Sequence, residues 1–197
     1  MKKNSLVFAF VFIIVIVLAF TIPKLDKLTH EPPNAQMQKD MANEALKHID
    51  SHYLFSAEGQ MANSTPFTWD EDECRTDEPK NCTNVRHFDC SGLVFYCANK
   101  VGFNLSWVGS NDQYHPSSHS LYYKHYVKKI QLSQLSKGSL VFKEKEGEIF
   151  HVGIYLGNES VVESTQDSDF NGVQIKSWDQ WLSGSFEIRA GDLIPRT

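Results

Sequence analysis

The segment His87-Phe88-Asp89-Cys90-Ser91-Gly92-Leu93-Val94 predicts the start of a helix. Asp89 is a good N-cap, because its carboxylate can accept hydrogen bonds from the free amides of the first turn. Apolar residues then recur at helical spacing as far as Val101, and Gly102 is suited to the position just after a helix end. We therefore expect a helix that starts beside Cys90 and is anchored in the core by its apolar side chains.

This arrangement places the Cys90 thiol at a helix N-terminus. The partial positive charge and the open N–H groups of a helix end favour a thiolate over a thiol. The amides of this first turn, including that of Ser91, can also receive the oxyanion that forms when a thiolate adds to an amide. The alternative is an ordinary buried cysteine, since cysteine is among the most buried residue types. A reactive Cys90 needs a partner elsewhere in the chain.

The chain of 197 residues has a net charge of −5, which gives no electrostatic case for binding nucleic acid. Two lysines precede an unbroken apolar run over 6–20, a pattern typical of an export signal. We favour an uncleaved signal-anchor over 1–22, followed by a juxtamembrane linker over 23–36 and a domain over 37–197 outside the cytoplasm. Cleavage near Ala19, which would release a secreted protein, is the alternative.

Export affects the interpretation of the cysteines, because an oxidising compartment permits disulfides. Cys74 and Cys82 lie in a polar, turn-rich segment, close enough to bridge a short loop, so we predict a Cys74–Cys82 disulfide. Cys90 and Cys97 are two turns apart along the predicted helix, too far for a disulfide without distortion. We expect Cys97 to be a buried thiol and Cys90 to be free.

Hydrophobic periodicity predicts helices first and antiparallel strands afterwards, which indicates an α+β domain. An amphipathic helix is expected over 37–49, a short extended segment over 53–56, and one helical turn around Trp178 and Trp181. The predicted strands occupy 140–142, 149–156, 160–164, 173–175 and 186–194.

Residues 60–86 have the composition of an insertion, with prolines, turn residues and the acidic run 70–73. A functional interpretation of this run is a cation site or a selectivity lip over the active site. A solvated loop is the alternative, and we favour it because like charges in a row usually mark solvent exposure and the spacing of EF-hand ligands is absent from the sequence. His115, His119 and His125 lack the close spacing of zinc ligands. We expect neither a metal nor a cofactor.

A second candidate for chemistry is His151, in the strand predicted over 149–156. Phe150, Val152, Ile154 and Leu156 alternate on the core face of this strand, and His151 lies on the other face with Gly153. The missing side chain of the glycine leaves room in front of the imidazole. An isolated histidine is more often structural, but one paired with a capped cysteine in an exported chain is a candidate general base.

A third group should orient the imidazole. If 157–159 is a three-residue hairpin loop, Glu163 lies on the same face as His151, one diagonal step away and within reach of a long side chain. A two-residue or four-residue loop would turn Glu163 to the opposite face. Thr165 and Gln166 are then the alternatives, and we choose Glu163.

Together these motifs resemble the NlpC-type cysteine peptidases, papain-like endopeptidases that cut peptidoglycan stem peptides. The resemblance implies a papain-like α+β fold, with Cys90 as the nucleophile, His151 as the general base and Glu163 in the place of the third polar residue. It also implies that Tyr53 helps to bind the tetrahedral intermediate. The matching segments, in the family's order, are 88–94, 110–114, 135–142, 151–157 and 161–164.

The resemblance further implies a cell-wall hydrolase that cuts between D-glutamate and the diamino acid of peptidoglycan, without a cofactor. The family usually has histidine or a neutral polar residue where Glu163 stands, and a carboxylate there is similar to the related CHAP amidases. Ser56-Ala57 replaces the family's glycine pair, and Phe67 is a competing alignment for Tyr53. The alternatives are thus a CHAP-like N-acetylmuramoyl-L-alanine amidase and an inactive wall-binding module.

Overall fold

The described part of the chain carries the predicted catalytic residues but not the predicted export segment. The signal-anchor over 1–22, most of the insertion over 60–86 and the Cys74–Cys82 disulfide lie outside it and stay predictions. Within the described residues, no helix is both long and apolar enough to cross a bilayer. The computed structural model describes residues 32, 34–61, 86–106, 116–167 and 170–196.

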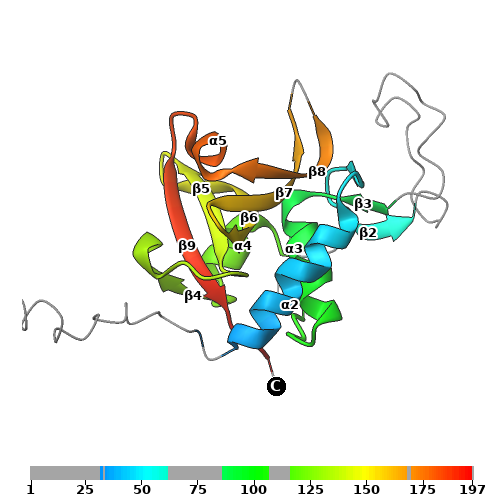
Figure 1. Ribbon diagram of the computed structural model, residues 1–197, viewed down its shortest axis with the longest axis horizontal. Helices are drawn as coiled ribbons and strands as arrows, with labels where there is room; N and C mark the ends of the chain where they lie inside the picture. Colours follow the sequence, from blue (N-terminus) through cyan, green and yellow to red (C-terminus); the bar gives the residue numbers. More distant parts are fainter. Residues whose placement is uncertain (1–31, 33, 62–85, 107–115, 168–169, 197) are drawn as a thin grey trace, which may run out of the picture. The chain divides into compact units, whose positions relative to one another are not determined.

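Two longer helices pack against each other and against the main sheet (Figure 1). Helix α2 (Ala35–Ala45) begins slightly earlier than predicted and ends in the 3-10 turn η1 (Leu46–His48). Helix α3 (Cys90–Lys100) is the helix predicted from its N-cap, and Gly102 follows it with a φ of +92°. The shorter helical elements are α4 (Ser118–Tyr123), η3 (Leu132–Gln134) and α5 (Trp178–Leu182).

Six antiparallel strands form the main sheet, in the order β4-β9-β5-β6-β7-β8. All five strands predicted from residue 140 onward are present, so the α+β class is confirmed. Strand β4 is not among the predicted strands, because its two consecutive lysines, Lys128 and Lys129, leave the segment without an apolar alternation. The bounds are β4 (Val127–Ile130), β5 (Leu140–Lys145), β6 (Glu148–Gly157), β7 (Ser160–Gln166), β8 (Asn171–Ser177) and β9 (Glu187–Leu193).

A smaller three-stranded sheet leads directly into α3. It consists of β1 (His52–Tyr53), β3 (Arg86–Phe88) and β2 (Glu58–Met61), with β3 in the middle. Because β3 is followed at once by Asp89 and Cys90, this sheet fixes the position of the helix start.

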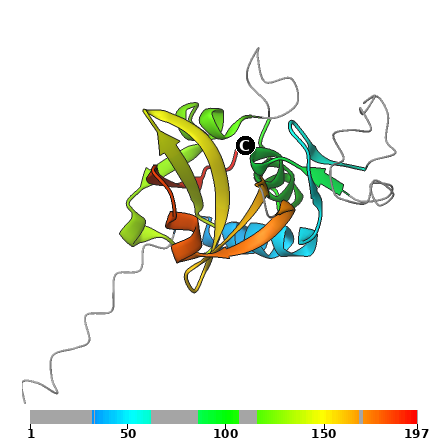
Figure 2. The ribbon, with the colours of Figure 1, turned by 90° about the horizontal axis from the view of Figure 1, so that it is seen from above.

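The main sheet carries a separate apolar cluster on each face. The larger cluster joins α2 and α3 to the sheet, and the smaller one contains Val141, Val161 and Trp181. Val161 and Val162 are adjacent on β7 but belong to different clusters, because successive side chains of a strand point to opposite faces. Seen from above, the curved strand β6 passes beside α3 (Figure 2).

The turn between β6 and β7 differs from the prediction. Gly157 pairs with Ser160, so the turn has two residues rather than three. Those residues, Asn158 and Glu159, have φ values of +47° and +56°, as a two-residue type I′ hairpin requires. The three-residue loop predicted over 157–159 is therefore wrong, because two residues that tolerate positive φ close the hairpin.

A β-bulge nevertheless restores the predicted register farther along the hairpin. Leu156 has no partner on β7, and the pairing shifts by one residue at that point. Beyond the bulge Ile154 pairs with Val162, the register that a three-residue loop would give. Glu163 thereby stays on the face of His151.

A second bulge lies at Phe150, on the other side of β6. Lys143 pairs with His151, but the next residue of β5, Glu144, pairs with Ile149. Ile149 is 4% exposed and Phe150 is 51% exposed. The prediction that Phe150 faces the core is therefore wrong, because the bulge turns Ile149 inward in its place.

Candidate active site

Cys90 is buried at the first position of α3, where Asp89 organises the surrounding backbone. One oxygen of the Asp89 carboxylate accepts a hydrogen bond from the Gly92 amide at 2.6 Å and another from the Ser91 hydroxyl at 3.0 Å. The other oxygen accepts from the Ser56 amide at 2.8 Å. The cap therefore holds the helix start and the segment after β1 together. The Ser91 hydroxyl serves the cap, and the oxyanion contact of the Ser91 amide stays a prediction.

Gly92 allows the segment 54–58 to lie directly against the first turn of α3. A Cβ atom at this position would overlap the carbonyl oxygen of Ala57. That carbonyl accepts a hydrogen bond from the Asp89 amide at 2.9 Å, and the Leu54 amide donates to Phe88 at 3.1 Å. These contacts lock β1 and the residues after it beside Cys90.

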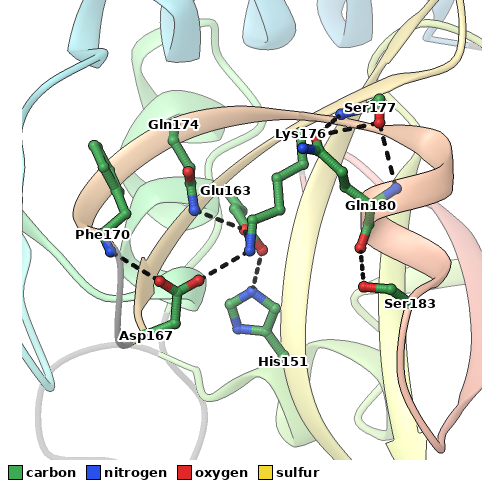
Figure 3. A network of polar contacts seen from close by, with 9 residues as sticks. All are labelled: His151, Glu163, Asp167, Phe170, Gln174, Lys176, Ser177, Gln180 and Ser183. Carbon is green, nitrogen blue, oxygen red and sulfur yellow. Dashed lines mark hydrogen bonds and ion pairs between the residues drawn. The ribbon is translucent and has the colours of Figure 1, made fainter.

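His151 and Glu163 come from neighbouring strands and form a short hydrogen bond (Figure 3). The Nε2 atom of His151 lies 2.6 Å from Oε2 of Glu163. The Cys90 thiol lies close enough to His151 for its charge to act on the imidazole, and since Nε2 faces Glu163, the other ring nitrogen is left for the thiol. The structure thus brings the three residues together in the order Cys90, His151, Glu163.

The charges at this site favour a protonated imidazole. Burial alone lowers the pKa of His151, but the negative charge and hydrogen bonds of Cys90 and of Glu163 outweigh it and raise the pKa to about 9. The imidazole therefore keeps its proton as the pH rises through neutrality and loses it near pH 9. An imidazolium beside a sulfur is the arrangement of a thiolate–imidazolium pair.

Glu163 is 1% exposed, and three polar side chains surround its carboxylate (Figure 3). Besides the bond to His151 through Oε2, Oε1 lies 3.0 Å from Nζ of Lys176 and accepts from Nε2 of Gln174 at 3.3 Å. Burial would raise the pKa of Glu163, but the contacts with His151 and Lys176 outweigh it and keep the pKa below its usual range. The carboxylate is therefore held ionised in a buried position.

Trp181 fills the space in front of the imidazole. Its ring centroid lies 5.4 Å from that of His151, with 31° between the planes. A side chain on Gly153 would come within 2.9 Å of this indole and 2.5 Å of Val161. The room predicted beside Gly153 is thus occupied by a fully buried tryptophan, which restricts the rotation of the imidazole.

The geometry can be compared with that of known proteins. The model of the NlpC/P60 family matches residues 64–194, well over half of the chain. The chain belongs to the NlpC/P60 family. The family predicted from the nucleophile and base motifs is therefore confirmed.

Curated relatives match part of the chain. The probable endopeptidase p60 of Listeria grayi is 34% identical over 133 residues, which cover 65% of this chain and 21% of the relative. The murein DD-endopeptidase MepH of Escherichia coli is 30% identical over 96 residues, which cover 48% of this chain and 32% of MepH. The chain thus matches only a minor part of each of these proteins.

Solved structures show the NlpC/P60 fold of the chain. The P60 domain of an antigen from Mycobacterium avium subspecies paratuberculosis matches with a TM-score of 0.52 and 19% identity, covering 82% of this chain and 97% of that one. RipD of Mycobacterium tuberculosis, described as a non-catalytic NlpC/P60 protein adapted to peptidoglycan binding, matches with a TM-score of 0.52 and 20% identity, covering 81% and 98%.

Tyr53 lies close enough to Cys90 for the charge of Cys90 to shift the pKa of the Tyr53 hydroxyl. Burial, and then the negative charges of Cys90 and Asp89, raise the pKa of the Tyr53 hydroxyl, so it stays protonated. Tyr53 pairs with Phe88, the last residue of β3, and Cys90 follows Phe88 by two residues at the start of α3. A protonated hydroxyl here can donate a hydrogen bond.

The remaining cysteines and histidines of the NlpC/P60 domain are only partly described. Cys90 is free and Cys97 is a buried free thiol, as predicted; Cys90 is also buried, although the prediction placed it at the mouth of the helix. Of the three histidines that lack zinc-ligand spacing, His119 is half-buried, with its Nδ1 atom 2.9 Å from Oε2 of Glu148, and His125 is exposed. His115 lies outside the described residues. In the described part of the domain, no group of three or more histidine, cysteine or acidic side chains is placed to hold a metal.

Sequence reasoning finds Cys90, His151 and Glu163 but misses the residues that support them. Trp181 is predicted from the sequence only as part of a helical turn, and no role at the site is predicted for Lys176 or Gln174. The available signal is their spacing: they lie two residues apart on β8, the strand that pairs with the strand of Glu163. Residues at this spacing share a face and can reach a neighbour across the ladder.

Proposed function

We propose that the chain is a thiol hydrolase that cleaves peptide bonds in peptidoglycan stem peptides. The observation that carries the proposal is the grouping of Cys90, His151 and Glu163, with 2.6 Å between the imidazole and the carboxylate and the thiol near enough to act on the imidazole. Membership in the NlpC/P60 family and relatives named as endopeptidases support the same substrate class. The predicted export segment is consistent with a substrate outside the cytoplasm.

In the proposed mechanism His151 takes the proton of Cys90 and so generates the nucleophile. The thiolate attacks the carbonyl carbon of the stem peptide, and the imidazolium then gives its proton to the leaving amine. Water hydrolyses the resulting thioester and regenerates the free thiol. Glu163 acts by orienting the imidazole and stabilising its charge, as the third member of a triad does.

The oxyanion that forms during the attack needs hydrogen-bond donors. We assign this role to the backbone amides at the start of α3, including that of Ser91, and to the Tyr53 hydroxyl. The nearby Tyr53 keeps its proton because burial and the charges of Cys90 and Asp89 oppose ionisation. Donors held in place before the reaction stabilise the transition state without having to reorganise.

The bond between D-glutamate and the diamino acid is our proposed target, because the nucleophile and base motifs are those of endopeptidases that cut it. A second candidate is amide cleavage between N-acetylmuramic acid and L-alanine. The specific observation that favours this candidate is Glu163, since a Cys-His-Glu set is the one that the similar CHAP amidases use. A non-catalytic wall-binding module, as RipD is described, is the third outcome to test.

Mass spectrometry of digested sacculi separates these outcomes. We expect the full-length protein to cut the stems and the Cys90→Ala variant to leave the sacculi intact. A muramidase added afterwards should release, from the cut sacculi, disaccharides that carry shortened stems ending in D-glutamate. Disaccharides without any peptide would contradict the endopeptidase and indicate an amidase. Intact sacculi with both proteins, together with sedimentation of the folded wild type on the sacculi, would indicate a binding module.

A further inference from the structure

Lys176 is placed to act on the active site through Glu163, and this inference rests on the proposed function. It lies on β8, opposite Val161 of β7, so it is a diagonal neighbour of Glu163 on the same face of the sheet. Its Nζ atom lies 3.0 Å from Oε1 of Glu163 (Figure 3). Since Oε2 is the oxygen that meets His151, the two cations approach different oxygens of one carboxylate.

We propose that Lys176 is a positioning residue, which fixes Oε1 of Glu163 so that Oε2 stays directed at the imidazole of His151. A carboxylate that had only the imidazole as a partner could rotate and exchange its oxygens. Gln174 also donates to Oε1, but at 3.3 Å and without a charge. The lysine provides the stronger, charge-assisted contact and compensates the cost of burying an ionised carboxylate.

Among the described residues, two further charged groups, His151 and Lys143, act on this carboxylate, and neither is placed to hold Oε1 as Lys176 does. His151 comes from β6 and in turn faces Cys90 of α3. Lys143 comes from β5, but its Nζ atom lies over the ring of Trp181, 4.3 Å from the centroid, and contributes to Glu163 only through its charge. Lys143 is therefore a poor substitute for a direct contact with Oε1.

Asp167 holds Lys176 in its place. Its Oδ2 atom lies 3.0 Å from Nζ of Lys176, and its Oδ1 atom accepts a hydrogen bond from the Phe170 amide at 2.9 Å. Lys176 also lines a cavity of about 390 Å³, which has room for a larger side chain. An arginine at this position can therefore keep both ion pairs, whereas a methionine keeps the volume but loses the charge.

The test compares Lys176→Met and Lys176→Arg with a matched control, Lys128→Met, which removes an exposed lysine from β4 at the opposite edge of the sheet. We expect Lys176→Met to lower kcat on soluble muropeptides by about tenfold with little change in KM, and Lys176→Arg to recover most of the loss. Lys128→Met should match the wild type. Thermal unfolding checks that each variant is folded.

The pKa of Glu163, measured by carboxyl ¹³C NMR titration, gives a second test. It needs no turnover, and a purely structural role of Lys176 would not change it. In Lys176→Met the pKa of Glu163 should rise, because the lysine that favours the ionised form is gone. In a Glu163→Gln background, Lys176→Met should change kcat by less than about twofold, because the two residues act as one unit.

If the wild-type protein did not cleave muropeptides at all, the proposed function would be refuted, but the role of Lys176 in holding Glu163 would still be tested by the titration. An unmoved Glu163 titration, or an undiminished effect of Lys176→Met in the Glu163→Gln background, would refute the role of Lys176.

Discussion

Replacing Cys90 with alanine is expected to lower kcat/KM for peptidoglycan fragments by at least about a thousandfold, or about 4 kcal/mol of transition-state stabilisation. No other thiol among the described residues can take over, because Cys97 is fully buried in the core. The fold should persist, since the Asp89 cap holds the start of α3 through the Gly92 amide and the Cys90 side chain is small. Hydrolysis of muropeptides, followed by mass spectrometry, measures the loss, and circular dichroism monitors the fold.

The matched control is Cys97→Ala, on the same helix. Cys97 is 0% exposed and lies in the larger apolar cluster, so its truncation should cost about 1 kcal/mol of unfolding free energy. Activity should stay within about twofold of the wild type, since Cys97 does not contact His151 or Glu163 in the described contacts. Equal losses of activity in both variants would mean that Cys90 contributes to the fold and not to the chemistry.

Replacing Gly92 with alanine is expected to damage both the fold and the activity. The new methyl group would overlap the carbonyl oxygen of Ala57 and come within 3.1 Å of Cα of Glu58. Both neighbours are backbone, which cannot rotate away as a side chain can. We expect a loss of about 3 kcal/mol of unfolding free energy, measured by urea denaturation. The activity of the protein that remains folded should also fall, because the shift moves Tyr53 away from Cys90.

A useful comparison for Gly92→Ala is Gly147→Ala. Gly147 lies in the turn between β5 and β6 with a φ of +86° and has no atom within 4 Å of an added Cβ. Alanine there strains the backbone by about 1 kcal/mol without a steric clash, and it should leave the activity unchanged. If Gly92→Ala were no more destabilising than Gly147→Ala and fully active, the close approach of the segment 54–58 would not matter for the site.

The nucleophile end of the site is predictable from sequence because its signals are local. An N-cap aspartate, two small residues and an apolar helix lie within a few positions of Cys90, and α3 begins where they indicate. The His151 strand is equally local, since its alternation of apolar residues covers most of β6. The bulge at Phe150 is not visible in this pattern, because it depends on the pairing of β6 with β5.

The face on which Glu163 lies is predicted correctly only because two features that are not visible in the sequence cancel each other. A two-residue turn and a bulge at Leu156 together give the register that a three-residue loop would give. The contacts of Lys176 and Trp181 depend on how β8 and α5 pack on β7 and β6, and each residue alone looks like an ordinary surface or core residue. Long-range packing, and not local propensity, decides these supporting positions.

The central claim, that Cys90 is activated by His151, is tested most directly by the rate of alkylation of each cysteine with iodoacetamide, resolved by peptide mass spectrometry. Near pH 6 we expect Cys90 to react at least about tenfold faster than glutathione, Cys97 to stay unmodified, and His151→Ala to slow Cys90 to the rate of glutathione or below. A Cys90 that reacts no faster than glutathione, or equally fast with and without His151, would contradict the account.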